Sequence, residues 1–365
     1  MTTTKTSNFF YDKSLFGLEI GHGSLKVMQL APRPENLPAN KPYHPGIIGY
    51  GFAAFDTASQ RDGVIIQPEI VAKAARELFE KQIIGTINTR RVAIAIPAYR
   101  IFTRSLQIPK LKQKELNEAV QLEAEQYIPA PLEELYLDYE IIKQKPDATE
   151  LLVVAAPRII VDSYLDLARI LGLETVLIEP TLSSLGRLFS LDSQSDVPAV
   201  IINFGSVSSD ISIFDRHMLV TGTVPGGGED FTKSIQDHLK ISFDEAALIK
   251  TRYGLSVSKK QADIKHALEP ILQQIVKEIR RIIRYYDERY GTTRPIGQVI
   301  TLGGGANMPG LDEYFIEALH LAVRRSEPWQ YLDFRGLQAP EPSDRPMYAT
   351  AAGLALAKPK EVFKP

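Results

Sequence analysis

The sequence predicts an α/β protein built from two related lobes. Apolar runs of strand length alternate with segments of helical periodicity, and that mixture is typical of α/β folds. The strand-length runs lie at residues 15–20, 92–96, 151–156, 200–204, 211–214 and 299–302. Residues 15–30 and 199–214 also align without a gap, each as strand, Gly/Ser turn and strand. A repeat offset by about half of the chain indicates two lobes of common plan.

Helical periodicity is clearest at residues 69–81, 114–127, 160–171, 243–253 and 263–290. In the longest segment, apolar side chains form one stripe from Leu268 to Tyr286, and charged residues lie off that stripe. The pattern predicts a helix with one buried face, and Pro270 predicts a start or a kink nearby. Residues 31–46 are rich in proline and separate two predicted strands, so we expect a long hairpin loop there.

Composition excludes several classes of function. The chain has 365 residues, enough for two or three domains, and contains no cysteine, which removes disulfide scaffolds, thiolate metal sites and cysteine nucleophiles. Forty-two basic residues against 44 acidic ones give a formal charge of -2, so no overall field favours nucleic acid or anionic lipid. The N-terminus is polar and no run of 18 apolar residues occurs, so we expect a soluble cytoplasmic protein without a secretory signal.

Two short turns at matching positions of the repeat have the composition of phosphate-binding loops. The turns and their flanks comprise Gly21, His22, Gly23, Ser24 and Lys26 in the first copy and Gly205, Ser206 and Ser208 in the second. Glycine tolerates the positive φ angles that let N–H groups converge on an anion. One such turn is usually an ordinary hairpin, whereas two matching turns favour a polyphosphate held between the lobes. His22 fits either a phosphate contact or a partly exposed turn histidine.

Two further glycine clusters precede predicted helices. Gly227 and Gly228 lead into a helix whose free N-terminal N–H groups favour an anion, although a flexible connection capped by Asp230 explains the same sequence. The other cluster follows a predicted strand and consists of Gly303, Gly304, Gly305 and Ala306. Backbone without side chains allows a flat ring such as adenine to approach closely, but one glycine triplet is a weak signal.

The order of these motifs resembles the actin-like ATPase superfamily. Its phosphate-1, connect-1, phosphate-2, adenosine and connect-2 motifs correspond to residues 17–26, 178–181, 202–211, 301–311 and 349–355. The resemblance implies a two-lobed, ribonuclease-H-like α/β fold with ATP or ADP and Mg²⁺ in the cleft between the lobes. The two turns would then hold the phosphates, and residues 304–306 would face the adenine.

More narrowly, the chain is similar to the PilM family of type IV pilus assembly proteins, itself similar to the division protein FtsA. Residues 104–109, 115–126, 127–129 and 137–139 resemble that family's inserted subdomain 1C. The resemblance implies a flexible N-terminus at 1–13, subdomain 1A at 14–89, 165–197 and 345–358, and subdomain 1C at 90–164. Subdomain 2A would comprise 198–229 and 292–344, subdomain 2B 230–291, and the tail 359–365.

Departures from the superfamily concern the metal and the reaction. Relatives usually carry aspartate where this chain has Glu19 and Asn203, and a neutral amide cannot replace a carboxylate in holding Mg²⁺. The resemblance assigns the metal to Glu19 and Asp210, and the catalytic roles to Asp210 and to Glu179, which would orient the attacking water. Relatives usually carry a further motif with a glutamate and a lysine, of which this chain keeps only Lys250. Lys250 is either a nucleotide contact or a solvated surface charge. We therefore expect ATP binding with weak or absent hydrolysis.

Three functions follow from the resemblance. The first is an adaptor of the type IV pilus, or of a related type II secretion platform, that binds the N-terminal cytoplasmic tail of a PilN-like inner-membrane protein through residues 92–106 and 114–127. It would reach the membrane only through that protein, with the motor ATPases, the platform protein and a second copy of the chain as further candidate partners. The alternatives are an ATP-hydrolysing switch, which Asn203 disfavours, and an FtsA-like polymerising membrane tether. Residues 358–365 are too short and proline-bounded for the amphipathic helix that such a tether uses.

Overall fold

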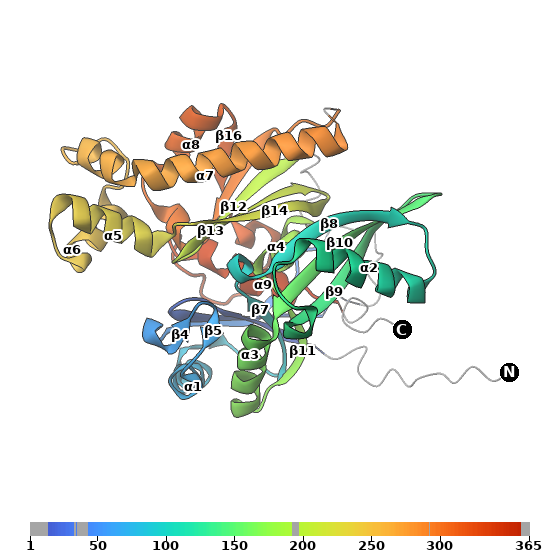
Figure 1. The fold of residues 1–365 in the computed structure, drawn as a ribbon. Helices are drawn as coiled ribbons and strands as arrows, with labels where there is room; N and C mark the ends of the chain where they lie inside the picture. The colour runs from blue at the N-terminus through green and yellow to red at the C-terminus, as the bar shows by residue number, and fades with distance from the viewer. Residues whose placement is uncertain (1–13, 33, 35–42, 192–196, 292, 359–365) are drawn as a thin grey trace.

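The computed structural model describes residues 14–32, 34, 43–191, 197–291 and 293–358. Two mixed sheets lie in two lobes, and a third, smaller sheet stands beside them (Figure 1). The α/β class and the two lobes expected from the sequence are confirmed. Among the described residues, none of the helices is both long and apolar enough to cross a membrane. The expected flexible N-terminus at 1–13 and the tail at 359–365 lie outside the described residues.

The first lobe contains a six-stranded sheet with the order β11-β7-β1-β2-β3-β6. Its strands are β1 (Phe16–Ile20), β2 (Ser24–Leu30), β3 (Ile47–Ala54), β6 (Ile84–Gly85), β7 (Arg91–Ile96) and β11 (Glu174–Pro180). Because β1 lies antiparallel to β2 and parallel to β7, the first copy of the repeat is a hairpin. β2 and β3 also pair antiparallel, although much of their expected loop at 31–46 lies outside the described residues.

Helices α1 (Pro68–Glu77) and α3 (Arg158–Ile170) pack against each other and against this sheet. Their buried side chains, such as Val71 and Tyr164, recur at helical spacing, and burying that apolar face is the main force that holds each helix in place. α1 ends earlier than predicted, since the chain continues in a π-helical turn, η2 (Leu78–Gln82). The short strands β4 (Gln60–Arg61) and β5 (Val64–Ile65) form a separate pair between β3 and α1.

The second lobe contains a five-stranded sheet with the order β14-β13-β12-β15-β16. Its strands are β12 (Ala199–Phe204), β13 (Ser208–Asp215), β14 (His217–Pro225), β15 (Gln298–Leu302) and β16 (Ala322–Arg325). Its helices are α5 (Gly228–Leu239), α6 (Phe243–Arg252), α7 (Gln261–Tyr290) and α8 (Leu311–Leu319). The predicted apolar stripe of α7 is buried against β13 and β14 (Figure 1). Pro270 lies inside α7 rather than at its start.

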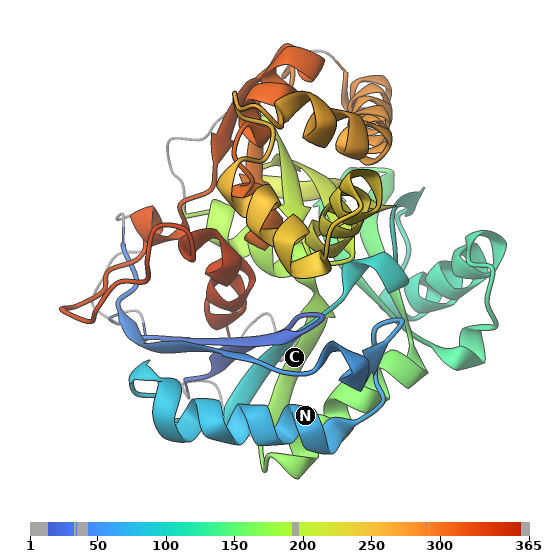
Figure 2. The same ribbon diagram turned by 90° about the vertical axis from the view of Figure 1, so that its left-hand side faces the viewer.

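Two helices lie between the sheets of the two lobes, α4 (Thr181–Phe189) and α9 (Ala349–Ala355). Figure 2 shows α9, in red, between the blue strands of the first lobe and the yellow helices of the second. One cluster of buried side chains joins both helices to both sheets. Glycine permits the close packing, because a Cβ atom at Gly353 would lie 2.1 Å from the Ser184 carbonyl oxygen.

A module beside the first lobe consists of β8 (Phe102–Pro109), α2 (Gln113–Tyr127), β9 (Leu135–Gln144) and β10 (Ala148–Pro157). Its sheet has the order β8-β10-β9, and α2 covers one face with Leu116 and Val120. The expected limits of this module, 90–164, are too wide. β7 pairs with β1 and β11, and α3 packs against α1, so both belong to the first lobe.

The module also contacts the second lobe, at the C-terminal end of α7. The Tyr290 hydroxyl donates to Glu150 Oε1 at 2.9 Å, and the Arg289 guanidinium donates to Ser105 Oγ at 3.0 Å. Glu150 and Ser105 are buried, so these bonds are shielded from competing water. The module is therefore held by both lobes.

Candidate functional site

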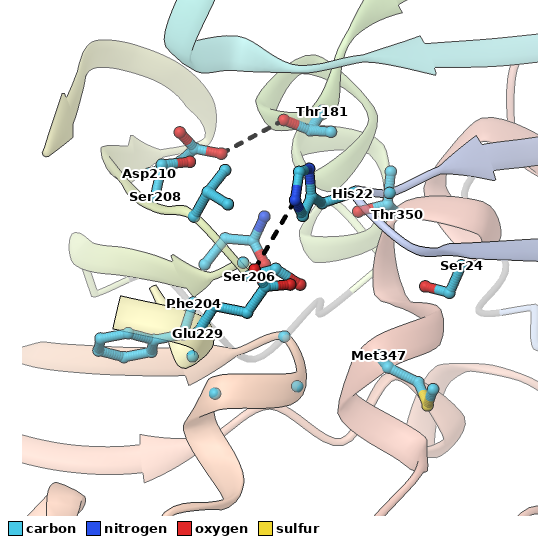
Figure 3. Close-up of a pocket in the computed structure, with 18 of the residues that line it drawn as sticks. His22, Ser24, Thr181, Phe204, Ser206, Ser208, Asp210, Glu229, Met347 and Thr350 are labelled. Carbon is cyan, nitrogen blue, oxygen red and sulfur yellow. Dashed lines mark hydrogen bonds and ion pairs between the residues drawn. The ribbon is translucent and has the colours of Figure 1, made fainter. Parts of the chain in front are cut away.

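A cavity of about 360 Å³ lies between the two lobes (Figure 3). The β1–β2 hairpin borders it from the first lobe, and the β12–β13 hairpin, the start of α5 and the start of η5 (Gly304–Asn307) border it from the second. Most of the predicted site residues meet here, namely Glu19, Gly21, His22, Ser24, Lys26, Gly205, Ser206, Ser208, Asp210, Gly228, Lys250, Gly303, Gly304 and Gly305. Four predicted residues do not line the cavity, namely Gly23, Glu179, Gly227 and Ala306.

The two hairpins that border the cavity have matching turns. The Gly21 N–H donates to the Ser24 carbonyl at 2.8 Å, and the Gly205 N–H donates to the Ser208 carbonyl at 2.9 Å. The expectation that these glycines adopt positive φ is wrong, since neither they nor Gly23 does so. Close approach explains Gly23 instead, because a Cβ there would lie 2.7 Å from Thr57 Cγ2.

The residues that flank the two turns occupy matching positions of the repeat but differ in charge. Glu19 pairs across the strands with Lys26, and Asn203 pairs across the strands with Asp210. Lys26 Nζ lies 3.2 Å from Glu19 Oε1, and the lysine is buried. Glu19 Oε2 is also buried and has no hydrogen-bonding partner. The first hairpin therefore holds a charge pair with one free oxygen, and the second holds a carboxyl group beside an amide.

Asp210 is a buried carboxyl group that lines the cavity opposite Glu19. It accepts hydrogen bonds from Thr223 Oγ1 at 2.8 Å and from Thr181 Oγ1 at 3.5 Å (Figure 3). Burial raises its pKa to about 6, and the hydrogen bonds from Thr223, Thr181 and Asn203 oppose that shift. No full positive charge among these partners neutralises it, so a cation in the cavity would stabilise its ionised form.

Glu179 does not reach the cavity that the sequence assigned to it. It is buried at the end of β11, and both of its carboxylate oxygens accept from Arg187 of α4, Oε2 at 2.8 Å from Nη2. A bidentate arginine fixes a carboxylate in one orientation and satisfies much of its accepting capacity. The assignment of Glu179 to the attacking water is therefore not supported by its position.

The first two N–H groups of α5 are already bonded. The Gly228 N–H donates to the Gly205 carbonyl and the Glu229 N–H to the Ser206 carbonyl, both at 2.8 Å. Asp230 accepts from the Gly227 N–H at 3.0 Å, which is the helix cap that the sequence also allowed. These contacts join α5 to the second turn, so Gly227 and Gly228 position that turn rather than bind an anion with their own N–H groups.

The glycine triplet after β15 opens onto the cavity. Gly303 has φ +82° and lies against Phe204, where a Cβ would be 2.5 Å from the carbonyl oxygen. At Gly304 a Cβ would meet no atom within 4 Å, so the cavity is open at that point. Ala306 is fully buried behind the triplet. A flat ring thus has room beside Gly304 but not beside Ala306.

The sequence allowed two interpretations each for Lys250 and His22, and the structure gives their contacts. Lys250 Nζ donates to the Gly228 carbonyl at 2.5 Å and to Thr232 Oγ1 at 2.7 Å, and burial lowers its pKa. Lys250 is therefore not a solvated surface charge. His22 Nε2 lies 3.7 Å from Glu229 Oε2, so this turn histidine faces α5 across the cavity (Figure 3).

Several cavity residues were missed by sequence reasoning, including Gln60, Tyr99, Thr181, Met347 and Thr350. Thr181 lies in the connect-1 segment, and that motif could have indicated it. Gln60 and Tyr99 come from the short elements β4 and η3 (Ala98–Arg100), which have too few residues for a periodic signal.

Two smaller hollows lie next to the module. One, of about 240 Å³, lies between η3, β8, the start of α4 and β14, and Tyr99 separates it from the large cavity. The other, of about 210 Å³, lies between β8, β10 and the end of α2. Phe102 and Thr103 border both hollows, so the two are neighbours. Both candidate partner segments, 92–106 and 114–127, contribute to the second hollow.

Two repeated hairpins that enclose one cavity between two sheets define a protein of the actin-like fold. A solved PilM-PilN type IV pilus biogenesis complex shares this fold with a TM-score of 0.79 and 24% identity, covering 94% of this chain and 98% of that chain. The ethanolamine utilization protein EutJ from Carboxydothermus hydrogenoformans has a TM-score of 0.54 at 16% identity, over 94% of this chain and 89% of that chain. MreB5 of Spiroplasma citri bound to AMPPNP has a TM-score of 0.51 at 13% identity, over 93% of this chain and 94% of that chain.

Over residues 17–359 the chain matches the family described as type IV pilus assembly protein PilM, and it belongs to that family. The cell division protein FtsA of Bacillus subtilis is 26% identical over 179 residues, which are 44% of this chain and 38% of FtsA. FtsA of Enterococcus faecalis is 27% identical over 177 residues, 43% of this chain and 40% of that protein. The matched region thus spans only about two fifths of these relatives.

Proposed function

We propose that this chain is a cytoplasmic, nucleotide-binding adaptor of the type IV pilus, or a related type II secretion, assembly platform. It binds ATP or ADP between its lobes and the N-terminal cytoplasmic tail of a PilN-like inner-membrane protein on its module. The observation that carries the proposal is the pair of matching Gly/Ser turns that face one cavity in a member of the PilM family. Motor ATPases, the platform protein and a second copy of the chain are further proposed partners.

The nucleotide is proposed to lie across the cavity. Backbone N–H groups and hydroxyls of the turns at Gly21–Ser24 and Gly205–Ser208 suit a chain of phosphates. The open backbone at Gly304 suits the adenine, because a flat ring needs space without side chains. MreB5, a protein of the same fold, was solved bound to AMPPNP, which supports a nucleotide as the ligand.

Mg²⁺ would be held by Glu19, Asp210 and the nucleotide together. The described residues include no group of three histidine or acidic side chains that could hold a metal alone. However, Mg²⁺ is often bound through one or two carboxylates plus phosphate and water, and two carboxylates line this cavity. The buried, unpartnered Glu19 Oε2 is available as one such ligand. The metal would neutralise phosphate charge and stabilise the ionised form of Asp210.

Hydrolysis is proposed to be weak or absent. Glu179 is held by Arg187 outside the cavity, and Asn203 stands where relatives carry a carboxylate. A general base must be within hydrogen-bonding reach of the water that it activates, and Glu179 has no such access here. The alternative of an active ATP-hydrolysing switch requires a rearrangement that frees Glu179 from Arg187.

The PilN-like tail is proposed to lie over the two hollows beside the module. The hollow between β8 and α2 is lined mainly by apolar side chains, including the exposed Phe102 and Tyr127. Arg104 stacks over Tyr127 with its guanidinium carbon 3.5 Å from the ring centre, which keeps the aromatic wall in place. An extended peptide can place side chains in such neighbouring hollows and bond its backbone to the rim.

A matched pair of tyrosine variants tests this site. Tyr127 and Tyr136 are 43% and 40% exposed in the same module, and each lies under an arginine. Of the two, only Tyr127 lines either of the two hollows described above. We expect Tyr127→Ala to weaken binding of a synthetic PilN-like N-terminal peptide about tenfold and Tyr136→Ala to leave it unchanged, as measured by calorimetry. Equal effects of the two variants would place the peptide elsewhere.

A further inference from the structure

Gln60 is a buried side chain in the cavity to which no motif assigns a role. It lies on β4, in the short segment between β3 and α1, and lines the cavity from the first lobe. The residue is 7% exposed, and its Nε2 atom is buried without a hydrogen-bonding partner. A buried amide donor without a hydrogen-bonding partner destabilises the folded chain, so such a donor indicates a ligand that supplies the missing acceptor.

Gln60 belongs to a group of polar side chains that gather at one end of the cavity. The hydroxyl of Tyr164 of α3 is buried and makes no well-formed hydrogen bond. Burial and the nearby Tyr99 and Glu19 raise its pKa, and the adjacent Gln60 side chain, which can reach the hydroxyl, lowers it. Burial raises the pKa of the Tyr99 hydroxyl, and the charge of Asp210 adds to that rise, so Tyr99 lies near Asp210. Glu19, Gln60 and Tyr164 thus contribute three unpartnered polar atoms from three different elements. The first lobe has unused hydrogen-bonding capacity here, opposite Asp210.

The position of this group along the cavity identifies its ligand. Glu19 and Gln60 line the cavity from the first lobe, whereas the glycine triplet proposed for the adenine follows β15 in the second lobe. A nucleotide that lies across the cavity in this direction extends its last phosphate toward Gln60. We propose that Gln60 binds the terminal phosphate of a nucleoside triphosphate and sets the preference of the site for a triphosphate over a diphosphate. This inference rests on the proposed nucleotide site.

The chemistry of the carboxamide suits this role. Phosphate oxygens only accept hydrogen bonds, and a half-turn of the amide about its last torsion exchanges Nε2 with Oε1. In that orientation Nε2 donates to phosphate, and Oε1 accepts from the Tyr164 hydroxyl, so both unmade bonds are formed. Lys26 supplies positive charge nearby but is already paired with Glu19, whereas Gln60 is a neutral donor without a well-formed hydrogen bond.

The test compares two nucleotides on the full chain. We expect Gln60→Met, which keeps the length of the side chain and removes the donor, to weaken binding of a non-hydrolysable ATP analogue with Mg²⁺ about tenfold or more. ADP binding should change less than twofold. Gln60→Glu should lower the ATP-analogue affinity further, because a carboxylate repels the phosphate. Ser59→Ala is the matched control, since Ser59 is adjacent, fully buried and also unpartnered, but does not line the cavity.

The outcomes separate this inference from the proposed function. A wild-type chain that binds neither nucleotide would overturn the nucleotide site itself. In the alternative result, the wild type binds both nucleotides while Gln60→Met and Gln60→Glu leave the ratio of the two affinities unchanged. That result would overturn the role of Gln60 but not the nucleotide site. A thermal unfolding midpoint of Gln60→Met at or above the wild-type value without nucleotide shows that the loss of binding is local. Ser59→Ala should match the wild type in its affinity for both ligands.

Discussion

Asp210 and Glu179 show how burial and one neighbour decide the role of a carboxyl group. Both are buried acidic residues in segments that resemble nucleotide-binding motifs. Asp210 lines the cavity and accepts hydrogen bonds from the neutral hydroxyls of Thr223 and Thr181. Glu179 is bound by the charged Arg187 and does not line the cavity. The sequence places both in motifs of one kind, but the arginine eight residues further along carries no signal that distinguishes them.

The first prediction concerns the pH dependence of stability. Burial raises the pKa of Asp210 to about 6 from 3.8, so the folded state keeps this proton at a pH where the unfolded state has lost it. The free energy of unfolding of the wild type should therefore fall by up to about 3 kcal/mol through Asp210 as pH rises from about 4 to about 6. The variant Asp210→Asn should not show this fall in the free energy of unfolding. Urea unfolding of both proteins from pH 4 to 7, without nucleotide, measures the difference between their free energies of unfolding. A difference that does not change with pH would contradict the raised pKa of Asp210.

The second prediction concerns Glu179. Because Glu179 is held by Arg187 away from the cavity, Glu179→Gln should leave the rate of phosphate release with excess Mg·ATP at its low wild-type level. The glutamine keeps the size of the side chain and can still accept from Arg187. Sustained wild-type turnover that the substitution abolishes would instead favour the hydrolysing switch.

Among the helices and strands, sequence periodicity predicted the long elements and missed the short ones. All six apolar runs are strands, and the five periodic segments are helices, because each buries a continuous face. β4 and η3, which bring Gln60 and Tyr99 to the cavity, have two and three residues and no pattern. The limits of the module were also missed, since pairing of β7 with β1 is a contact between distant residues.

The third prediction concerns the open backbone of η5. Gly304 has free space at its Cβ position, so Gly304→Phe should leave the unfolding temperature of the free protein nearly unchanged while filling the proposed adenine position. The rise in unfolding temperature at saturating Mg·ATP should then fall by at least half. Gly303→Ala is the contrasting variant, because its positive φ and its contact with Phe204 should lower stability without ligand. An unchanged ATP-induced rise in Gly304→Phe would rule out the adenine assignment.

At the scale of the whole molecule, the repeat predicted two lobes, but only the structure shows how they are joined. α4 and α9 form one core with both sheets, and the module is bonded to α7 of the second lobe through Tyr290 and Arg289. These contacts depend on side chains that meet across long sequence separations, which a single sequence does not reveal. The cavity between the lobes and the hollow at α2 share no lining residue, and Tyr99 is the common border of the cavity and the other hollow.

That arrangement leads to the most direct test of the adaptor. A synthetic N-terminal peptide of the PilN-like protein is titrated into the full chain by calorimetry, once without nucleotide and once with saturating Mg·ATP. Because the hollow at α2 is complete without any ligand between the lobes, we expect one-to-one binding in both conditions. Absence of peptide binding in both conditions would contradict the adaptor, and binding only with Mg·ATP would favour the nucleotide-driven switch.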